Sequence, residues 1–319
     1  MAQLTTIGTS PATSAGWVDH PPRMGFFTDT SICIGCKACE VACKEWNQVP
    51  EDGLEFTGMS FDNTVGLGAD TWRHVAFIEQ RRPATGTAAG LQSDRAVSHA
   101  GEALQSVVQA GTVTGEGAVA GEGVVAGEGA VTQVRWLMAS DVCKHCTDAG
   151  CLDVCPTGAL FRTEFGTVVV QEDVCNGCGH CVPACPYGVI DQRRDDGRVW
   201  KCTLCYDRLQ VGMEPACSKA CPTNSIQFGV LDELRERADR RVAQLHAGGV
   251  TDARLYGNDP SDGVGGTGAF FLLLDEPEVY GLPPDPVVTT THLAGMWKRA
   301  AVAAVGVAVG AALSVLGGR

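Results

Sequence analysis

The sequence predicts an α+β protein with two small cysteine-rich modules and a single apolar helix near its C-terminal end. Three observations lead to this prediction. The sixteen cysteines fall into four groups of four, the segment after the last group combines a helical apolar pattern with a short buried strand, and residues 300–316 carry no charge. Short elements around cysteine loops are typical of a fold whose core is partly inorganic, and metal binding is then part of folding.

The cysteine groups have the spacing of iron-sulfur ligands. Close spacings place the thiols of a group in one tight loop, which suits a shared metal centre better than a disulfide. Pro156, Pro186 and Pro222 follow the fourth cysteine of three groups, as in the bacterial two-cluster signature. The sequence therefore predicts four [4Fe-4S] clusters. The groups are Cys33, Cys36, Cys39 and Cys43; Cys143, Cys146, Cys151 and Cys155; Cys175, Cys178, Cys181 and Cys185; and Cys202, Cys205, Cys217 and Cys221.

In that signature the fourth cysteine of each group ligates the other cluster of its module. Only a short segment separates Cys155 from Cys175, so the second and third groups should form one ferredoxin-like module and the first and fourth groups the other. This crossing rule assigns Cys33, Cys36, Cys39 and Cys221 to cluster 1; Cys143, Cys146, Cys151 and Cys185 to cluster 2; Cys175, Cys178, Cys181 and Cys155 to cluster 3; and Cys202, Cys205, Cys217 and Cys43 to cluster 4.

Zinc is the competing metal, because four-thiolate zinc sites also use closely spaced cysteine pairs. Zinc sites rarely have four cysteines in one short run followed by proline. A zinc-binding scaffold protein stays as the remote alternative. His145 and His180 lie inside cysteine groups that already have four thiols, so they are expected to donate hydrogen bonds or to lie on the surface rather than to bind metal.

Changes in composition along the chain predict the domain boundaries. The helical stripe from Leu231 to Leu245 ends at Gly248, and Phe270 to Leu274 is expected to be a buried strand. The predicted parts are a flexible N-terminal tail (1–22), module A with the first and fourth groups (23–82 and 199–230), a low-complexity insertion (83–132), module B with the second and third groups (133–198), a helix and strand extension (231–290) and a membrane anchor (297–318).

The insertion contains three tandem hexapeptides between Gly115 and Thr132. A hexapeptide period can indicate a parallel β-helix, but three units without a cap are too few to bury a core. We expect a loosely ordered surface insertion.

The uncharged run from Ala300 to Leu316 predicts a single membrane-spanning helix in contact with lipid. It is long enough to cross the hydrocarbon core of a bilayer, although only marginally. Gly306 and Gly310 form a pair that lets two membrane helices approach closely. The alternative is a buried alanine-rich core helix. Lys298 and Arg299 precede the run, which favours a cytoplasmic side for the clusters.

The overall charge argues against nucleic acid as a partner. The chain has a net charge of −13 and a pI near 4.9, whereas phosphate contact requires a basic surface. Residues 1–17 lack the basic and apolar regions of a cleavable secretory signal.

The chain resembles the iron-sulfur (beta) subunits of membrane-bound formate dehydrogenases of the N and O type. The resemblance rests on CIGCKACEVACKEWN from Cys33, CKHCTDAGCLDVCPTGAL from Cys143, CNGCGHCVPACPYGVI from Cys175, and KCTLCYDRLQVGMEPACSKACPTNSIQFG from Lys201. It extends to the segment GVGGTGAFFLLLDEPEVYGLPPDP ahead of the apolar helix, and the insertion departs from it.

This resemblance implies a non-catalytic electron-transfer subunit. Electrons would come from a molybdenum or tungsten catalytic subunit that oxidises formate and leave toward a membrane cytochrome b and quinone. The resemblance also implies an exported complex carried by a signal on the catalytic subunit, whereas the charges at the anchor favour the cytoplasmic side. The alternative within electron transfer is the same subunit for another molybdopterin oxidoreductase or a hydrogenase.

Overall fold

The computed structural model describes residues 10–53, 56–58, 61–83, 123–127, 130–291 and 293–317. The chain divides into two compact units. The first consists of Met1–Phe77 and Met138–Arg319, and the second is Ile78–Leu137. All sixteen cysteines lie in the first unit, and each unit is described below by itself.

A four-stranded sheet forms the centre of the first unit, with strand order β10-β11-β1-β9. β1 pairs in parallel with β11 and antiparallel with β9, and β10 pairs antiparallel with β11. The apolar sequences of β1 and β11 are buried along nearly their whole length, as expected for central strands covered on both faces. The strands are β1 (Met24–Asp29), β9 (Ile226–Val230), β10 (Arg254–Tyr256) and β11 (Ala269–Leu273).

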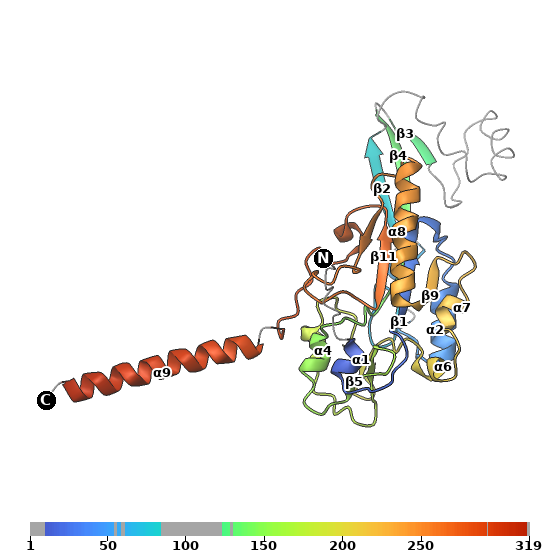
Figure 1. The fold of residues 1–319 in the computed structure, drawn as a ribbon. Helices are drawn as coiled ribbons and strands as arrows, with labels where there is room; N and C mark the ends of the chain where they lie inside the picture. Colours follow the sequence, from blue (N-terminus) through green and yellow to red (C-terminus); the bar gives the residue numbers. More distant parts are fainter. Residues whose placement is uncertain are drawn as a thin grey trace, which may run out of the picture. The chain divides into compact units, whose positions relative to one another are not determined.

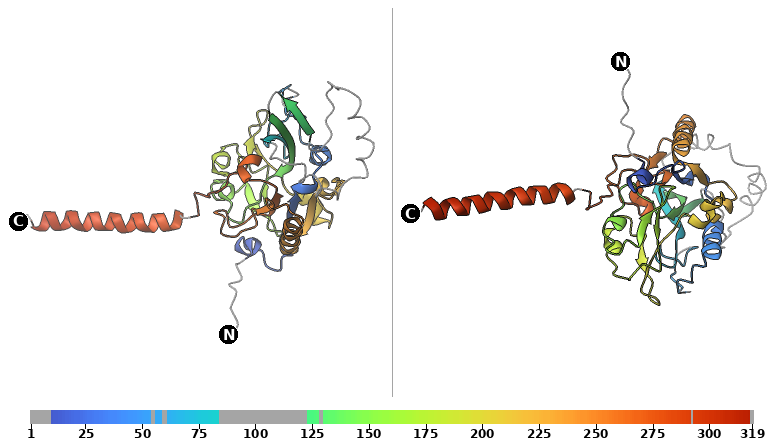
Figure 2. Two further views of the ribbon diagram at one scale, coloured as in Figure 1. Left: turned by 90° about the horizontal axis from the view of Figure 1, so that it is seen from above. Right: turned by 60° about the horizontal axis from the view of Figure 1, so that its bottom comes forward.

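Helix α8 (Leu231–Ala247) covers one face of this sheet (Figure 1 and Figure 2). Its buried residues Leu231, Leu234 and Ala238 pack against Phe27 and Phe270, whose rings stack with centroids 5.2 Å apart. A fully buried leucine or phenylalanine contributes about 1.5–3 kcal/mol relative to an exposed one. The predicted helix and the predicted buried strand are both confirmed.

The cysteine groups lie in loops and short helices attached to this sheet. Two antiparallel hairpins, β5/β6 and β7/β8, accompany them. The elements are η1 (Thr30–Ile32), α2 (Ala38–Asn47), α4 (Gly150–Asp153), β5 (Leu160–Arg162), β6 (Val168–Val170), α5 (Cys181–Ala184), β7 (Asp191–Gln192), β8 (Val199–Trp200), α6 (Tyr206–Gln210) and α7 (Ala216–Lys219).

Strands β2 (Arg73–Pro83) and β4 (Ala130–Val142) begin or end in the first unit and continue into the second. There β3 (Gly123–Gly127) forms an antiparallel hairpin with β4, in which Gly127 is opposite Ala130. The later hexapeptides are therefore paired strands, and the expectation of a loosely ordered insertion is wrong for this stretch. Alternating small and branched apolar residues can pair locally without a β-helix. The rest of the insertion, residues 84–122, lies outside the described residues.

The predicted N-terminal tail is ordered where the structure describes it. Helix α1 (Pro11–Ser14) buries Ala12, and the indole N–H of Trp17 donates to the carbonyl of Arg162 at 2.8 Å. This segment is therefore held at Ala12 and at the Trp17 indole, although residues 13–19 are exposed.

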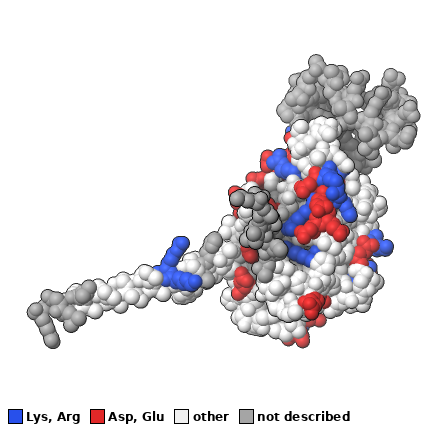
Figure 3. Space-filling view, viewed as in Figure 1, with Lys and Arg blue, Asp and Glu red and all other residues white. Residues whose placement is uncertain are grey.

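After η3 (Pro277–Tyr280), the last element is helix α9 (Leu293–Gly317), which includes most of the predicted membrane anchor. Its described surface carries basic residues near the start and no further charge (Figure 3). In the part of the chain that the structure describes, no helix has both the length and the apolar character that crossing a membrane requires. The side chains of Leu313 and of residues 315–317, and all of residues 318–319, lie outside the described part.

Candidate iron-sulfur centres

The first cysteine group occupies the loop between η1 and α2, and a glycine permits its shape. Gly35 has φ +66°, and a Cβ there would lie 2.6 Å from the Phe77 ring and 2.7 Å from the Met138 sulfur. Only glycine fits this close approach without displacement of its neighbours. Cys39 and Cys43 follow on one face of α2 and are buried.

The loop of the first group meets the last cysteine of the chain around a small cavity. The lining of this cavity includes Cys33, Cys36, Cys39 and Cys221, the four residues that the crossing rule assigns to cluster 1. Cys221 follows α7, so sulfurs from distant parts of the sequence converge here.

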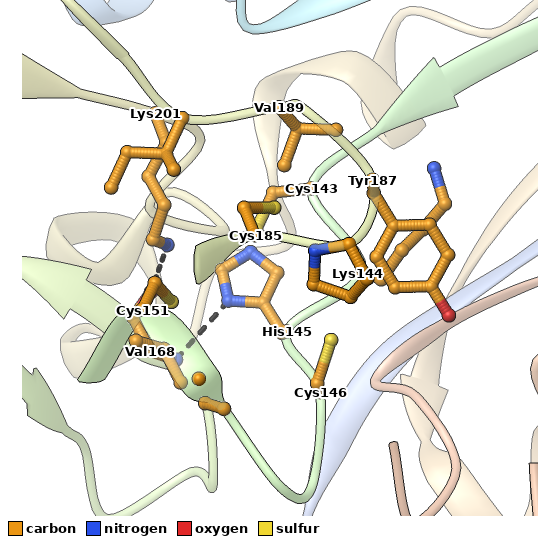
Figure 4. Close-up of a pocket in the computed structure, with 14 residues that line it drawn as sticks. Cys143, Lys144, His145, Cys146, Cys151, Val168, Cys185, Tyr187, Val189 and Lys201 are labelled. Atoms are coloured by element: carbon orange, nitrogen blue, oxygen red, sulfur yellow. Dashed lines mark hydrogen bonds between the residues drawn. The ribbon is translucent and has the colours of Figure 1, made fainter. Parts of the chain in front are cut away.

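A second cavity brings together the four residues assigned to cluster 2, which are Cys143, Cys146, Cys151 and Cys185 (Figure 4). Apolar side chains, including Val168, Val189 and Ile190, make up much of the remaining lining. A mostly apolar shell limits water access, which is one of the means by which a protein sets the potential of a redox centre.

The cysteines assigned to cluster 4, and likewise those assigned to cluster 3, lie close enough together for the charges of neighbouring cysteines to shift their pKa values. Burial raises the pKa of Cys43 well above its ordinary value, and the charges of Cys202, Cys217 and Cys205 raise it further. Burial likewise raises the pKa of Cys181 to about 11, with further contributions from Cys155, Cys175 and Cys178. The structure thus brings together the residues assigned to clusters 4 and 3.

All sixteen cysteines carry free thiols in the structure. Within the described ranges, no three side chains among cysteine, histidine, aspartate and glutamate form a group that could hold a single metal ion. Each of the four cysteine sets offers four thiols, which are the ligands that iron-sulfur clusters use.

The buried thiols are held in an environment that favours their neutral form before metal binding. Burial raises the pKa of Cys39 to about 11 and that of Cys151 to about 12. Because metal ligation requires thiolates, cluster assembly must release protons at these sites.

Hydrogen-bond donors already point at several sulfurs. Cys202 Sγ accepts from the backbone N–H of Leu204 at 3.3 Å, and Asn47 Nδ2 lies 3.7 Å from Cys43 Sγ and 3.8 Å from Cys205 Sγ. Such donors stabilise thiolate charge and would do the same for the added charge of a reduced cluster. The cysteine sets therefore fit the iron-sulfur centres that the sequence predicts.

The buried guanidinium of Arg73 is also a hydrogen-bond donor to these sulfurs, and the sequence analysis did not predict it. Arg73, at the start of β2, is 2% exposed, and its Nη2 donates to Cys217 Sγ at 3.4 Å. Its Nη1 donates to the carbonyl of Ser140, whose hydroxyl contacts Cys39 Sγ at 3.2 Å. Burial opposes its charge, but nearby thiolates raise the pKa of Arg73 above the ordinary value. No sequence motif marks this arginine, because its partners are distant in the chain.

Lys201, His145 and His180 are further polar residues that lie beside or within the cysteine groups. Lys201 is buried and donates to the carbonyls of Val168 and Cys202. His145 is buried beside the cluster 2 cysteines, whereas His180 is exposed, so the two histidines lie in different environments.

Each set of cysteines lies next to another set. A cysteine of one set is close enough to a cysteine of the next set for their charges to shift each other's pKa. Cys39 of the first set is a neighbour of Cys217 in the fourth. Cys202 of the fourth set is a neighbour of Cys143 in the second, and Cys151 of the second set is a neighbour of Cys181 in the third. The spatial order is first, fourth, second, third.

Two family models of 4Fe-4S dicluster domains match this chain, one over residues 32–159 and one over residues 134–231. The matched ranges contain all four cysteine groups. Fold and site therefore define a ferredoxin-type iron-sulfur protein, and the alternative of a zinc-binding scaffold is set aside.

Similar proteins narrow this class. The chain is 36% identical to the formate dehydrogenase iron-sulfur subunit of Haemophilus influenzae, over 96% of this chain and 81% of that protein. It is 36% identical to the iron-sulfur subunit of the nitrate-inducible formate dehydrogenase of Escherichia coli K12, over 88% of this chain and 79% of that protein. It is also 33% identical to the B subunit of the anaerobic dimethyl sulfoxide reductase of Escherichia coli K12, over 67% of this chain and 77% of that protein. The chain belongs to the family of formate dehydrogenase iron-sulfur subunits, which are electron-transfer rather than catalytic subunits.

Proposed function

We propose that this chain holds four [4Fe-4S] clusters, one in each cysteine set, and relays electrons from a formate-oxidising molybdenum or tungsten subunit to a membrane cytochrome b. When bound, the clusters supply one-electron acceptor sites whose geometry changes little on reduction. The names of its relatives support formate as the source of the electrons.

The observation that carries this proposal is the arrangement of the cysteine sets. The first and third sets each include an exposed cysteine, Cys36 and Cys178, whereas the cysteines of the fourth set, Cys43, Cys202, Cys205 and Cys217, are all buried. Together with the spatial order of the sets, this arrangement has accessible ends and an enclosed middle. It suits the entry of electrons at one end and their exit at the other.

The chain's residues would hold each site ready for charge transfer. The guanidinium of Arg73 and the amide of Asn47 place donors at thiol sulfur, and the apolar shell of the cluster 2 cavity excludes water. Fixed donors lower the reorganisation that accompanies a change of charge.

We further propose that α9 attaches the chain to the membrane, alone or with a membrane subunit, through the uncharged face of residues 300–316. The small residues Gly306 and Gly310 would allow close contact with another helix. For the side of the membrane, we favour the exported side that the family resemblance implies, against the preference of Lys298 and Arg299 for the cytoplasm.

The test is isolation of the chain with its partners under anaerobic conditions, followed by addition of formate. The proposal expects about sixteen iron and sixteen acid-labile sulfide per chain, as four four-iron clusters require, and reduction of the clusters by formate. Full cluster content without reduction by formate would contradict the assignment of the catalytic partner.

A second candidate is the same relay for another molybdopterin oxidoreductase, and the similarity to the dimethyl sulfoxide reductase B subunit favours it. Electrons would then run toward the catalytic subunit rather than from it. Reoxidation of the reduced chain by dimethyl sulfoxide in its isolated complex, with no response to formate, would select this candidate.

A further inference from the structure

His145 and Tyr187 line the cluster 2 cavity, and each has a buried polar atom that no described residue pairs with; the imidazole of His145 is the one that stands inside a cysteine group. His145 stands between Cys143 and Cys146 in the sequence, is 1% exposed, and contributes to the lining together with the four cysteines. Figure 4 shows its ring among the labelled cysteines. Its backbone φ of +46° is unusual for a residue with a side chain, so packing must hold it in place.

The loop that carries His145 is held in place by Gly268, which directly precedes β11. The N–H of Gly268 donates to the carbonyl of Lys144 at 2.8 Å, and a Cβ on Gly268 would lie only 3.2 Å from the Cβ of His145. The segment leading into β11 therefore supports this loop on the side of Gly268. Such support is expected where a conformation of higher energy serves a purpose.

The hydrogen bonds of the ring determine which nitrogen carries the proton. The backbone N–H of Val168 donates to Nδ1 at 3.1 Å, so Nδ1 is an acceptor without a hydrogen. A neutral imidazole then carries its proton on Nε2. Among the residues that the structure describes, Nε2 has no hydrogen-bond partner.

Leaving a buried donor unpaired destabilises the folded state, so native proteins nearly always provide a partner. Val168 itself is held at both ends, because Lys201 Nζ donates to its carbonyl while its N–H holds the ring. These fixed contacts leave Nε2 as a rigid donor beside four thiols. The partner it lacks must be something that enters this cavity.

We propose that the Nε2–H of His145 donates a hydrogen bond to a sulfur of the cluster held by Cys143, Cys146, Cys151 and Cys185, and that this bond raises the reduction potential of that cluster. The inference rests on the proposed function. The bond strengthens when the cluster gains an electron, because its acceptor becomes more negative. His145 is thus a donor to the cofactor rather than a metal ligand.

The strongest experiment compares two replacements of His145 with a replacement of the other histidine inside a cysteine group. His145→Asn keeps an acceptor near the position of Nδ1 but has no donor that reaches the cavity. His145→Gln places an amide N–H near the position of Nε2. His180→Asn is the control, because His180 is exposed.

Potentiometric titration of each variant in its complex, followed by electron paramagnetic resonance, gives the midpoints. For His145→Asn we expect one midpoint to fall so that the ratio of reduced to oxidised cluster at fixed potential drops about tenfold, or about 59 mV for one electron. His145→Gln should restore most of this shift, and His180→Asn should leave every midpoint unchanged. Unchanged midpoints in a fully loaded His145→Asn variant would overturn the inference.

A second measurement covers variants that fail to assemble the cluster. Wild-type protein labelled with ring-15N histidine should show a hyperfine coupling from nitrogen to a reduced cluster, and His180→Asn should retain it. Absence of this coupling in the wild type would overturn the inference, as would a coupling of the size expected for nitrogen bound directly to iron. Iron analysis distinguishes a failure of this inference from a failure of the proposed function, because a wild-type chain without iron contradicts the proposed function itself.

Discussion

Replacement of Arg73 by methionine tests whether a buried charge raises the reduction potential of the cluster held by Cys43, Cys202, Cys205 and Cys217. Methionine keeps much of the apolar stem but removes the positive charge and the hydrogen bond to Cys217 Sγ. Because Arg73 is almost fully buried, solvent cannot replace its charge. The loss should therefore appear in a potential rather than in surface properties.

The magnitude follows from the geometry around Cys217. At the 3.4 Å separation of Nη2 and Sγ, two unit charges in an effective dielectric of about 20 interact by about 5 kcal/mol. An added electron spreads over the whole cluster, and we take about a third of this value, ~1.5 kcal/mol. That energy corresponds to a fall in midpoint potential of about 60 mV for a one-electron couple.

The assay is a redox titration of the loaded complex, with Arg73→Lys and Arg208→Met as comparisons. The lysine variant keeps the charge and should shift the midpoint less than the methionine variant does. Arg208 is the matched control, because its guanidinium lies over the Trp46 ring at 4.1 Å and donates to the carbonyl of Glu214. A fully loaded Arg73→Met variant whose midpoints all match the wild type would refute the electrostatic argument.

Three further predictions concern cluster 3 and the tail. Cys178→Ser should remove or convert one cluster and so lower the iron content from about sixteen toward about twelve per chain. Electron transfer to quinone should stop, while dye reduction by formate persists. Loss of both activities would show instead that the cluster is needed for assembly of the complex. Gly177→Ala should destabilise the same loop more than Gly179→Ala, since both glycines have positive φ but only a Cβ at 177 would overlap the Gly197 carbonyl oxygen; equal losses of melting temperature would contradict this steric cause. Deletion of Ala300–Arg319 should release the chain from membranes, and a truncated chain that stays bound without its partners would disprove the anchor.

The sequence predicted the features that depend on local spacing. The cysteine groups and the stripe of α8 are local patterns, and each corresponds to an element or set that the structure contains. The crossing rule named four sets of thiols, and the structure brings the members of each set near one another. Their assignment to clusters stays a prediction until metal is measured.

Features that depend on distant pairing were beyond sequence reasoning. β1 pairs in parallel with β11, although Phe26 and its partner Ala269 are far apart in the chain. Arg73 meets Cys217 for the same reason, across a fold that no local pattern reveals. Low-complexity composition also misled the expectation for the last hexapeptides, because small residues can form a hairpin when a neighbouring strand is available.

The central claim is that four sets of thiols hold four iron-sulfur cubanes, and quantitative iron and acid-labile sulfide analysis of the anaerobically purified chain tests it most directly. The claim predicts about sixteen of each per chain, together with coupled signals of reduced four-iron clusters in electron paramagnetic resonance. A colourless protein with zinc in place of iron, or a chain with iron for only two clusters, would contradict it.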